Sequence, residues 1–317
     1  MPLSPERLGG NGQASTPTVG LVVDRMDWHA REVATALAAR GFGTAPVRLH
    51  LCGIATQSAS GLQIDGFGER LPDAVVVRSM SGGSFEAVTL RLGILHALRE
   101  CGVMVWNDAR AIERCVDKSM TSFLLARAGI ATPPTWSVES YDQARAIAHA
   151  ETKDAPLVLK PLFGSQGRGL RLIRKPDDLP RAEDVAGGVY YLQRFAGIER
   201  GGYHDFRLLV VRSRVVAAMQ RHSSHWITNV KRGGRPVPAL INDDLNALGV
   251  RAATAVGAEF AGIDILYGPD QQPTVLEVNS MPAWSGLQKV SSVNIAAGLV
   301  AALVDALAER RRREALA

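Results

Sequence analysis

Apolar runs alternate with amphipathic segments along the first third of the chain. The apolar runs lie at 18–24, 45–51, 74–77 and 103–106, and segments with helical spacing lie at 29–40 and 85–101. Strands that alternate with helices predict an open parallel sheet. Ligands on such sheets bind beyond the carboxyl ends of the strands. We therefore expect residues 24–29 and 78–84 to lie near any substrate.

The rest of the chain mixes both element types in a different order. Helices are predicted at 107–128, 141–150, 245–260 and 295–312, and strands at 156–161, 170–173, 188–195, 206–211, 215–221, 262–267 and 274–279. A Pro-rich break at 129–135 separates the first two of these helices. The predicted class is α/β, with an α+β arrangement in this second part.

The last two predicted strands carry acidic side chains. Asp264 lies in the first and Glu277 and Asn279 in the second, and 268–273 predicts a hairpin turn between them. A carboxylate inside a buried strand is costly unless it is neutralised. Two carboxylates and an amide on adjacent strands are hard oxygen donors, which suit Mg²⁺. The alternative is a strand pair whose polar residues face water.

Composition narrows the class of protein. The 317 residues are 46% hydrophobic with mean hydropathy near zero, which indicates a globular protein of two or three subdomains. The apolar runs are far shorter than the ~20 residues of a membrane helix. Residues 1–16 resemble a disordered leader without the apolar core of a signal peptide. Three widely spaced cysteines fit no zinc or disulfide pattern, so we expect a cytoplasmic protein. From the short apolar runs we expect no membrane partner.

The net charge is +5, which raises the question of nucleic acid. Arg310–Arg313 alone supply four of these charges in one run. A solvated helix end explains that run more simply, because cations are favourable near a helix C-terminus. We therefore expect no nucleic-acid partner; the alternative predicts salt-sensitive DNA binding that is lost without this run.

A glycine-rich segment at 164–169 joins two predicted strands. Its glycines allow the backbone to approach a phosphate closely, although such a segment is also a common tight turn. Lys160 precedes it in an apolar strand, where an anion would make a half-buried ammonium tolerable; the alternative is a lysine that extends to water. Arg207 and Arg221 follow on separate strands, where they are suited to neutralise a transferring phosphoryl group.

In this order, the pieces resemble the ATP-grasp superfamily, and specifically the ribosomal-S6-modification-type (RimK-like) α-L-glutamate ligases. The motifs lie at 111–118, 157–160, 164–169, 201–207, 231–234, 262–266 and 276–280. The resemblance implies a parallel-sheet pre-ATP-grasp domain at 17–110, a central ATP-grasp subdomain at 111–192 and a C-terminal subdomain at 193–317. It also implies ATP and two Mg²⁺ ions, which Mn²⁺ can replace, and a homodimer or homotetramer.

The resemblance also implies roles for individual residues. The nucleotide would be contacted by Lys118, Lys160, Asp205 and Asn229, and covered by a lid that includes Gly164, Ser165, Gln166, Gly167 and Gly169. The hinge that reads adenine would be Gln193, Arg194 and Phe195, with arginine where the family usually has glutamate. Arg207 and Arg221 would face the γ-phosphate and acyl phosphate, and Asp264, Glu277 and Asn279 would hold the metal ions.

The implied reaction is an ADP-forming ligation of a carboxylate to an amine. L-Glutamate, or a glutamylated intermediate, would become an acyl phosphate that the amine of an acceptor attacks. We expect the acceptor to meet residues on either side of the cleft, namely Asp27, Trp28, His29, Arg78, Trp284 and Ser285. The aromatic rings suit a flat acceptor, and Arg78 suits a carboxylate.

A further resemblance to glutamate ligases of the methanofuran and tetrahydromethanopterin pathways implies a small-molecule acceptor, of the tyramine, tyrosine or pterin type. The alternatives are a ligase that modifies a protein C-terminus and a non-catalytic ATP-binding regulator. The regulator would be expected to lose metal ligands, whereas Asp264, Glu277 and Asn279 are all present.

Overall fold

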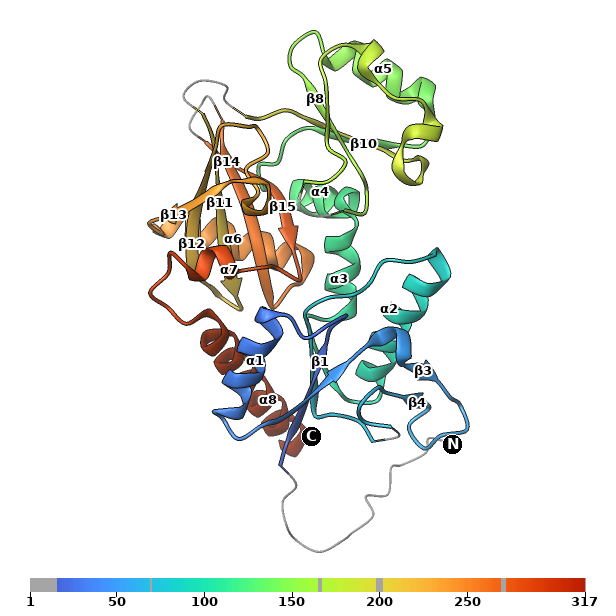
Figure 1. Cartoon of the computed structure of the whole chain (residues 1–317), viewed down its shortest axis with the longest axis vertical. Coiled ribbons are helices and arrows are strands. Elements are labelled where there is room, and N and C mark those ends of the chain that lie inside the picture. Colours follow the sequence, from blue (N-terminus) through green and yellow to red (C-terminus); the bar gives the residue numbers. More distant parts are fainter. Residues whose placement is uncertain (1–15, 69, 165–166, 198–201, 269–271, 317) are drawn as a thin grey trace, which may run out of the picture.

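The computed structural model describes residues 16–68, 70–164, 167–197, 202–268 and 272–316, so most of the predicted leader and the centre of the hairpin turn lie outside the described residues. A parallel sheet of order β2-β1-β5-β6 forms the N-terminal part (Figure 1). Its strands are β1 (Thr18–Val22), β2 (Gly43–Val47), β5 (Ala74–Val77) and β6 (Met104–Trp106). The predicted α/β class is confirmed.

Helices cover both faces of this sheet. On one face lie α1 (Trp28–Ala38) and α8 (Ile295–Leu316), and on the other lies α2 (Phe85–Glu100). A short hairpin of β3 (Gly53–Ile54) and β4 (Leu62–Gln63) lies beside α2. The helix α8 therefore returns from the C-terminal end of the chain to complete the core of the N-terminal sheet.

A small antiparallel sheet of order β7-β10-β8-β9 lies at the opposite end of the molecule (Figure 1). Its strands are β7 (Thr135–Val138), β8 (Leu157–Lys160), β9 (Arg171–Ile173) and β10 (Tyr190–Arg194). The helix α5 (Tyr141–Glu151) packs on one face and buries alanine side chains against it. The other face is left for the site described below.

A five-stranded antiparallel sheet of order β13-β12-β11-β14-β15 forms the third part of the molecule. Its strands are β11 (Tyr203–Val211), β12 (Arg214–Ser223), β13 (Arg235–Pro238), β14 (Phe260–Tyr267) and β15 (Pro273–Asn279). The helices around it are α3 (Ala109–Val116), α4 (Lys118–Arg127), α6 (Asp243–Val256) and the short α7 (Ser285–Gln288). One face packs on α6, and part of the other face shares a core with α8 and the N-terminal sheet.

Three predicted boundaries are wrong for local reasons. The helix expected at 245–260 ends at Val256, because Gly257 takes a left-handed conformation (φ 77°), and Phe260 begins β14. The helix expected at 107–128 is split at Asp117, whose side chain caps α4. The strand expected at 45–51 ends at Val47 and gives way to a 3₁₀ turn.

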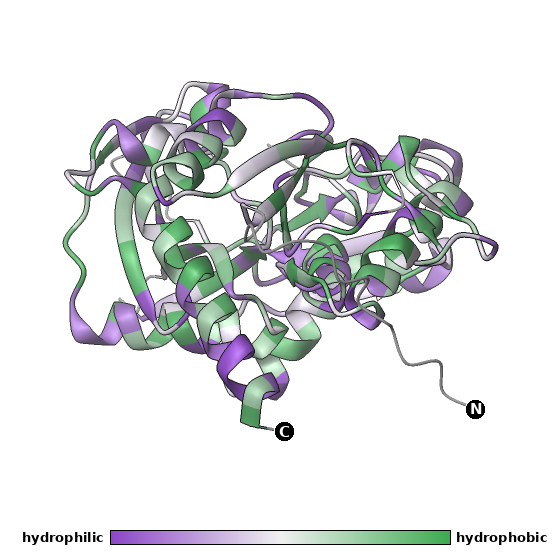
Figure 2. Ribbon diagram, turned by 90° about the horizontal axis from the view of Figure 1, so that it is seen from below, coloured by the Kyte–Doolittle hydropathy of each residue, from purple (hydrophilic) through white to green (hydrophobic). Residues whose placement is uncertain are grey.

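The arginine run lies in the last turns of α8, where Figure 2 shows hydrophilic residues near the C-terminus. Arg311 forms an ion pair with Asp73 (2.9 Å), and Arg310 pairs with Glu314 one turn later (2.7 Å). Arg310 and Arg311 are thus paired with acidic residues of the same chain. Among the described residues, no helix is both long and apolar enough to cross a membrane.

One buried amide joins the N-terminal part to the five-stranded sheet. The Asn107 side chain is fully buried and donates to the carbonyl oxygens of Phe260 (2.7 Å) and Ser280 (2.6 Å). Its Oδ1 accepts from the backbone N–H groups of Glu259 (2.7 Å) and Phe260 (3.0 Å). All four contacts are to backbone, so Asn107 fixes the chain just before β14 and just after β15.

Replacing Asn107 by leucine should destabilise the protein strongly, because it leaves four backbone groups without this partner, and three of these bonds are buried. We expect the free energy of unfolding to fall by about 3 kcal/mol or more, measured by urea denaturation. Asn294→Ala removes one exposed side-chain bond to Ala297 and should cost only about 1 kcal/mol. Equal losses in the two variants would contradict this role of Asn107.

Candidate functional site

A pocket between the small sheet and the five-stranded sheet collects most of the residues predicted to handle ATP. The predicted residues that line it are Lys118, Lys160, Gly164, Gly167, Gln193, Arg194, Phe195, Asp205, Arg221, Asn229, Asp264 and Glu277. Gly169, Arg207 and Asn279 are not among its lining residues, and Ser165 and Gln166 lie outside the described residues. Elements far apart in the sequence therefore meet in one place.

Two lysines supply positive charge to one wall of the pocket. Lys118 begins α4, and its Nζ donates to the carbonyl oxygens of Gly164 (2.7 Å) and Leu162 (3.3 Å). Lys160 ends β8, and its Nζ donates to Gln193 Oε1 (2.6 Å). No ion pair of either ammonium is found within the described parts of the chain. Both ammonium groups therefore face the pocket with only neutral hydrogen-bond acceptors among the residues described.

Burial acts on both of these ammonium groups. It lowers the pKa of Lys118 and of Lys160, and the nearby charge of Glu277 opposes that effect in both cases. The charge of Lys118 further lowers the pKa of Lys160. A bound polyphosphate would relieve both the desolvation and the repulsion between the lysines.

The opposite wall holds a network of paired charges. Arg207 binds Asp264 through two side-chain contacts, one of 2.7 Å between Nη2 and Oδ2. Arg221 binds Asp205 through two contacts, one of 2.7 Å between Nε and Oδ1, and also lies 3.1 Å from Asp264. Each of the four residues is at most 7% exposed.

These pairs follow from strand register, since Arg207 lies opposite Asp264 and Asp205 lies opposite Arg221. Burial alone would raise the pKa of Asp264, but the two guanidinium groups hold it well below its usual range. Arg221 lines the pocket, whereas Arg207 reaches Asp264 without lining it. Both predicted arginines are thus engaged by carboxylates.

The predicted metal ligands lie together on the hairpin of β14 and β15. Asp264 is paired with Glu277 across the hairpin, next to a break in register, and Asn279 Nδ2 donates to Glu277 Oε1 (3.0 Å). No group of three or more His, Cys, Asp or Glu suited to a metal occurs within the described ranges. Two carboxylates, an amide and the oxygens of a bound phosphate nevertheless fit the hard, partly hydrated coordination of Mg²⁺.

The glycine-rich loop touches the other side of the pocket. Gly167 has φ +67°, and a Cβ there would lie 2.7 Å from Ile227 Cγ2 and 2.9 Å from Asn229 Oδ1. The contact leaves no room for a side chain. Gly167 therefore lies directly against the segment that follows β12.

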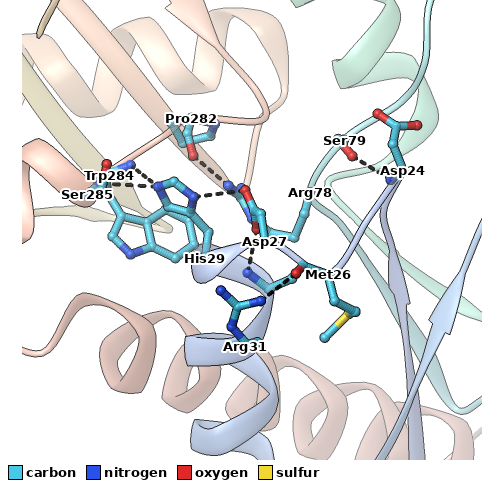
Figure 3. Close-up of polar contacts among 11 residues, drawn as sticks. Asp24, Met26, Asp27, His29, Arg31, Arg78, Ser79, Pro282, Trp284 and Ser285 are labelled. Atoms are coloured by element: carbon cyan, nitrogen blue, oxygen red, sulfur yellow. Dashed lines mark hydrogen bonds and ion pairs between the residues drawn. The ribbon is translucent and has the colours of Figure 1, made fainter. Parts of the chain in front are cut away.

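The side chains predicted to meet the acceptor form a second cluster (Figure 3). His29 Nε2 accepts from the backbone N–H groups of Trp284 (3.1 Å) and Ser285 (3.2 Å), so this nitrogen carries no proton. The other ring nitrogen, Nδ1, lies 3.1 Å from Asp27 Oδ2 and donates to it. The N-terminus of α1 is thus tied to the segment that follows the metal hairpin.

Arg78 is the charged centre of this cluster and is 7% exposed. Its Nη2 donates to the carbonyl oxygen of Pro282 (2.8 Å), and its guanidinium lies over the ring of Trp284 at 4.3 Å. Its Nε and Nη1 are buried and have no hydrogen-bond partner among the residues that the structure describes, and burial lowers its pKa to about 10. A buried cation without a carboxylate partner favours an anionic ligand.

The two tryptophans of the cluster differ in exposure. Trp284, expected to meet the acceptor, is 1% exposed and packs edge-on against His29 in the core, so almost none of its ring is accessible. Trp28 is 36% exposed and also contacts His29 edge-on. The accessible ring here is therefore Trp28.

The main pocket has further lining residues that the sequence did not assign to nucleotide binding. They are Tyr203, His204, Trp226 and Thr228, and Trp226 packs edge-on against Phe195 at 6.0 Å. Tyr191 lies beneath Lys160, with 6.0 Å between Nζ and the ring centroid. Tyr191 and Gln193 are two residues apart in a predicted strand and so share a face, which was the available signal for the contact of Tyr191 with Lys160.

Comparison with known proteins defines the class. Residues 115–303 match the family model of the RimK-like ATP-grasp domain. The chain belongs to this family of ATP-grasp ligases, whose named relatives form C–N bonds. The predicted family and enzyme class are confirmed.

Several relatives extend over most of the chain. The tetrahydromethanopterin:alpha-L-glutamate ligase of Methanosarcina acetivorans is 30% identical, over 86% of this chain and 94% of that protein. A probable alpha-L-glutamate ligase of Thioalkalivibrio sulfidiphilus is 31% identical, over 76% and 77%. The ATP-grasp ligase PsnB complexed with a minimal precursor shares the fold at 23% identity, with a TM-score of 0.68 over 92% of this chain and 99% of that one.

The cluster of Figure 3 should make stability depend on pH. Desolvation lowers the pKa of His29 below 6.5, and Arg78 adds to this, while Asp27 opposes it. As pH falls below about 6.5, the unfolded chain binds a proton at His29 before the folded chain does. The stability that the neutral imidazole of His29 contributes to the folded state is therefore lost on acidification.

We therefore expect His29→Gln to reduce the free energy of unfolding more at about pH 7.5 than at about pH 5.5, measured by urea denaturation. His149→Gln, on the exposed side of α5, should show no such difference. A loss for His29→Gln that grows on acidification would contradict the neutral state of His29.

Proposed function

We propose that this chain is an ADP-forming ligase that joins the carboxylate of L-glutamate, or of a glutamylated intermediate, to the amine of a small molecule. The observation that carries the proposal is the pairing of two walls in one pocket. One wall carries Lys118 and Lys160, which form no ion pair with any described residue, and the other presents Asp264 and Glu277. Such a pocket suits the phosphates of ATP together with Mg²⁺.

The chemistry divides into two steps. A carboxylate oxygen of the amino acid attacks the γ-phosphorus of ATP, which releases ADP and leaves an acyl phosphate. The amine nitrogen then attacks the acyl carbon, loses a proton and expels phosphate. Lys118 and Lys160 would bind the phosphate oxygens, and Arg221 lies on the pocket wall where charge accumulates.

Asp264, Glu277 and Asn279 would hold the metal. When bound, Mg²⁺ would offset phosphate charge and orient the transferring group. The paired arginines keep Asp264 ionised and in place, and the lid at Gly167 would exclude water from the acyl phosphate. No nucleophilic side chain is required by these steps.

The acceptor side of the proposal rests on the cluster around Arg78. Its buried guanidinium, which has no carboxylate partner among the described residues, favours a carboxylate, and the exposed ring of Trp28 suits a flat aromatic or pterin-type acceptor. The names of relatives support glutamate as the donor, since they are tetrahydromethanopterin:alpha-L-glutamate ligases and probable alpha-L-glutamate ligases. Asp27, His29 and Ser285 would shape this side of the cleft through the bonds described above.

The proposal is tested by ADP release from ATP with L-glutamate, Mg²⁺ and a panel of amine acceptors that includes tyramine, pterin-type amines and a peptide. We expect a small-molecule amine to stimulate ADP release and a mass spectrum to show the glutamyl adduct. Removing Mg²⁺ with a chelator should stop turnover, and Mg²⁺ or Mn²⁺ should restore it. Stimulation by the peptide alone would redirect the acceptor assignment, and ATP binding without any stimulated turnover would refute the ligase.

Glu277→Gln should reduce turnover by about a hundredfold or more, because it removes one negative charge and one metal ligand from the hairpin. Glu183→Gln makes the same change at an exposed position and should leave turnover unchanged. Thermal denaturation would show whether both variants keep the fold. Activity of Glu277→Gln near that of the unmodified protein would refute the metal assignment.

A further inference from the structure

Gln193 lies at the centre of a buried polar network in the small sheet. It is 2% exposed, and its Oε1 accepts from Lys160 Nζ at 2.6 Å. Its Nε2 donates to Thr135 Oγ1 (3.2 Å) and to the hydroxyl of Tyr191 (3.3 Å). The Tyr191 hydroxyl in turn lies 2.8 Å from Ser122 Oγ. All the polar atoms of the carboxamide are therefore used.

Strand register produces this arrangement. Lys160 on β8 lies opposite Tyr191 on β10, and Gln193 follows two residues later on the same face of β10. Thr135 on β7 lies opposite Gln193. Three adjacent strands therefore contribute to one network, and α4 adds Ser122 one turn after Lys118, the other lysine of the pocket.

The network fixes the orientation of the carboxamide. If the amide were turned over, its NH₂ group would face the ammonium of Lys160, and two donors would meet. The present orientation places an oxygen on the ammonium and directs both N–H groups to hydroxyl oxygens. Gln193 thus holds Lys160 through a neutral acceptor.

A neutral acceptor has a specific consequence for the pocket. A carboxylate at this position would pair with Lys160 and cancel its charge, as Asp264 and Asp205 do for the arginines across the pocket. A carboxamide restrains the ammonium but leaves its full charge for an anion.

We propose that Gln193 is a positioning residue for Lys160, which its side chain holds at the pocket in a charged and uncompensated state for the phosphate chain of the nucleotide. The proposal rests on the proposed function and deepens it, because it assigns the Gln193 side chain to the phosphate end of the ligand. Tyr191, Thr135 and Ser122 support this role by orienting the carboxamide.

The test compares ADP with adenosine, which share the base and ribose but differ in phosphate, by calorimetric titration in the presence of Mg²⁺. Gln193→Glu should weaken ADP binding by about tenfold or more and change adenosine binding by less than about threefold. In a Lys160→Met background, Gln193→Glu should change ADP binding by less than about threefold, because its target is gone. Gln220→Glu, on β12 and outside the pocket lining, should leave both affinities unchanged.

Equal weakening of ADP and adenosine would overturn the proposal in favour of base recognition by the Gln193 side chain. A penalty that persists in the Lys160→Met background would overturn it as well. Tyr191→Phe, which removes only a hydroxyl, provides a second variant if Gln193→Glu does not fold; ADP binding should weaken by about threefold with adenosine unaffected. Failure of the unmodified protein to bind ADP would refute the nucleotide site itself, whereas unchanged ADP binding by Gln193→Glu would refute only the role of Gln193.

Discussion

The buried pairing of Arg207 and Arg221 with Asp205 and Asp264 is the constraint on which the rest of the site depends. Four charges cannot lie inside a sheet unless each one has a partner. A shift of one residue in register would turn these side chains to the α6 face, where apolar residues pack. The network therefore fixes the register of β11, β12 and β14, and through β14 it fixes where Glu277 stands.

The two walls of the pocket differ in how their cations are compensated. The five-stranded sheet pairs Arg207 and Arg221 with its own carboxylates, whereas the two lysines from the small sheet and α4 have only neutral acceptors among the described residues. A ligand with several negative charges and a metal ion complements both walls at once. A neutral ligand would leave the cost of burying the lysines unrelieved.

The parts of the site that sequence reasoning found are those set by short-range rules. The two-residue period of a strand and the length of the turn place Asp264 opposite Glu277, and both were expected together. The side-chain partner of Gln193 depends instead on how β8 and β10 align, which no local pattern encodes. In the same way, α8 was expected as a closing helix, but its packing against α1 depends on the path of the whole chain.

The bonds of Asn107 limit which parts of the molecule can change position relative to one another. They tie the N-terminal sheet to both ends of the metal hairpin, and α8 adds a shared core between the same two parts. Those two parts are therefore joined both by hydrogen bonds and by a shared core. The small sheet is joined to them through α4, where Ser122 bonds to Tyr191 (2.8 Å) and Lys118 to Gly164 (2.7 Å), so any change in the angle between the small sheet and the rest would act directly on the wall that carries the lysines.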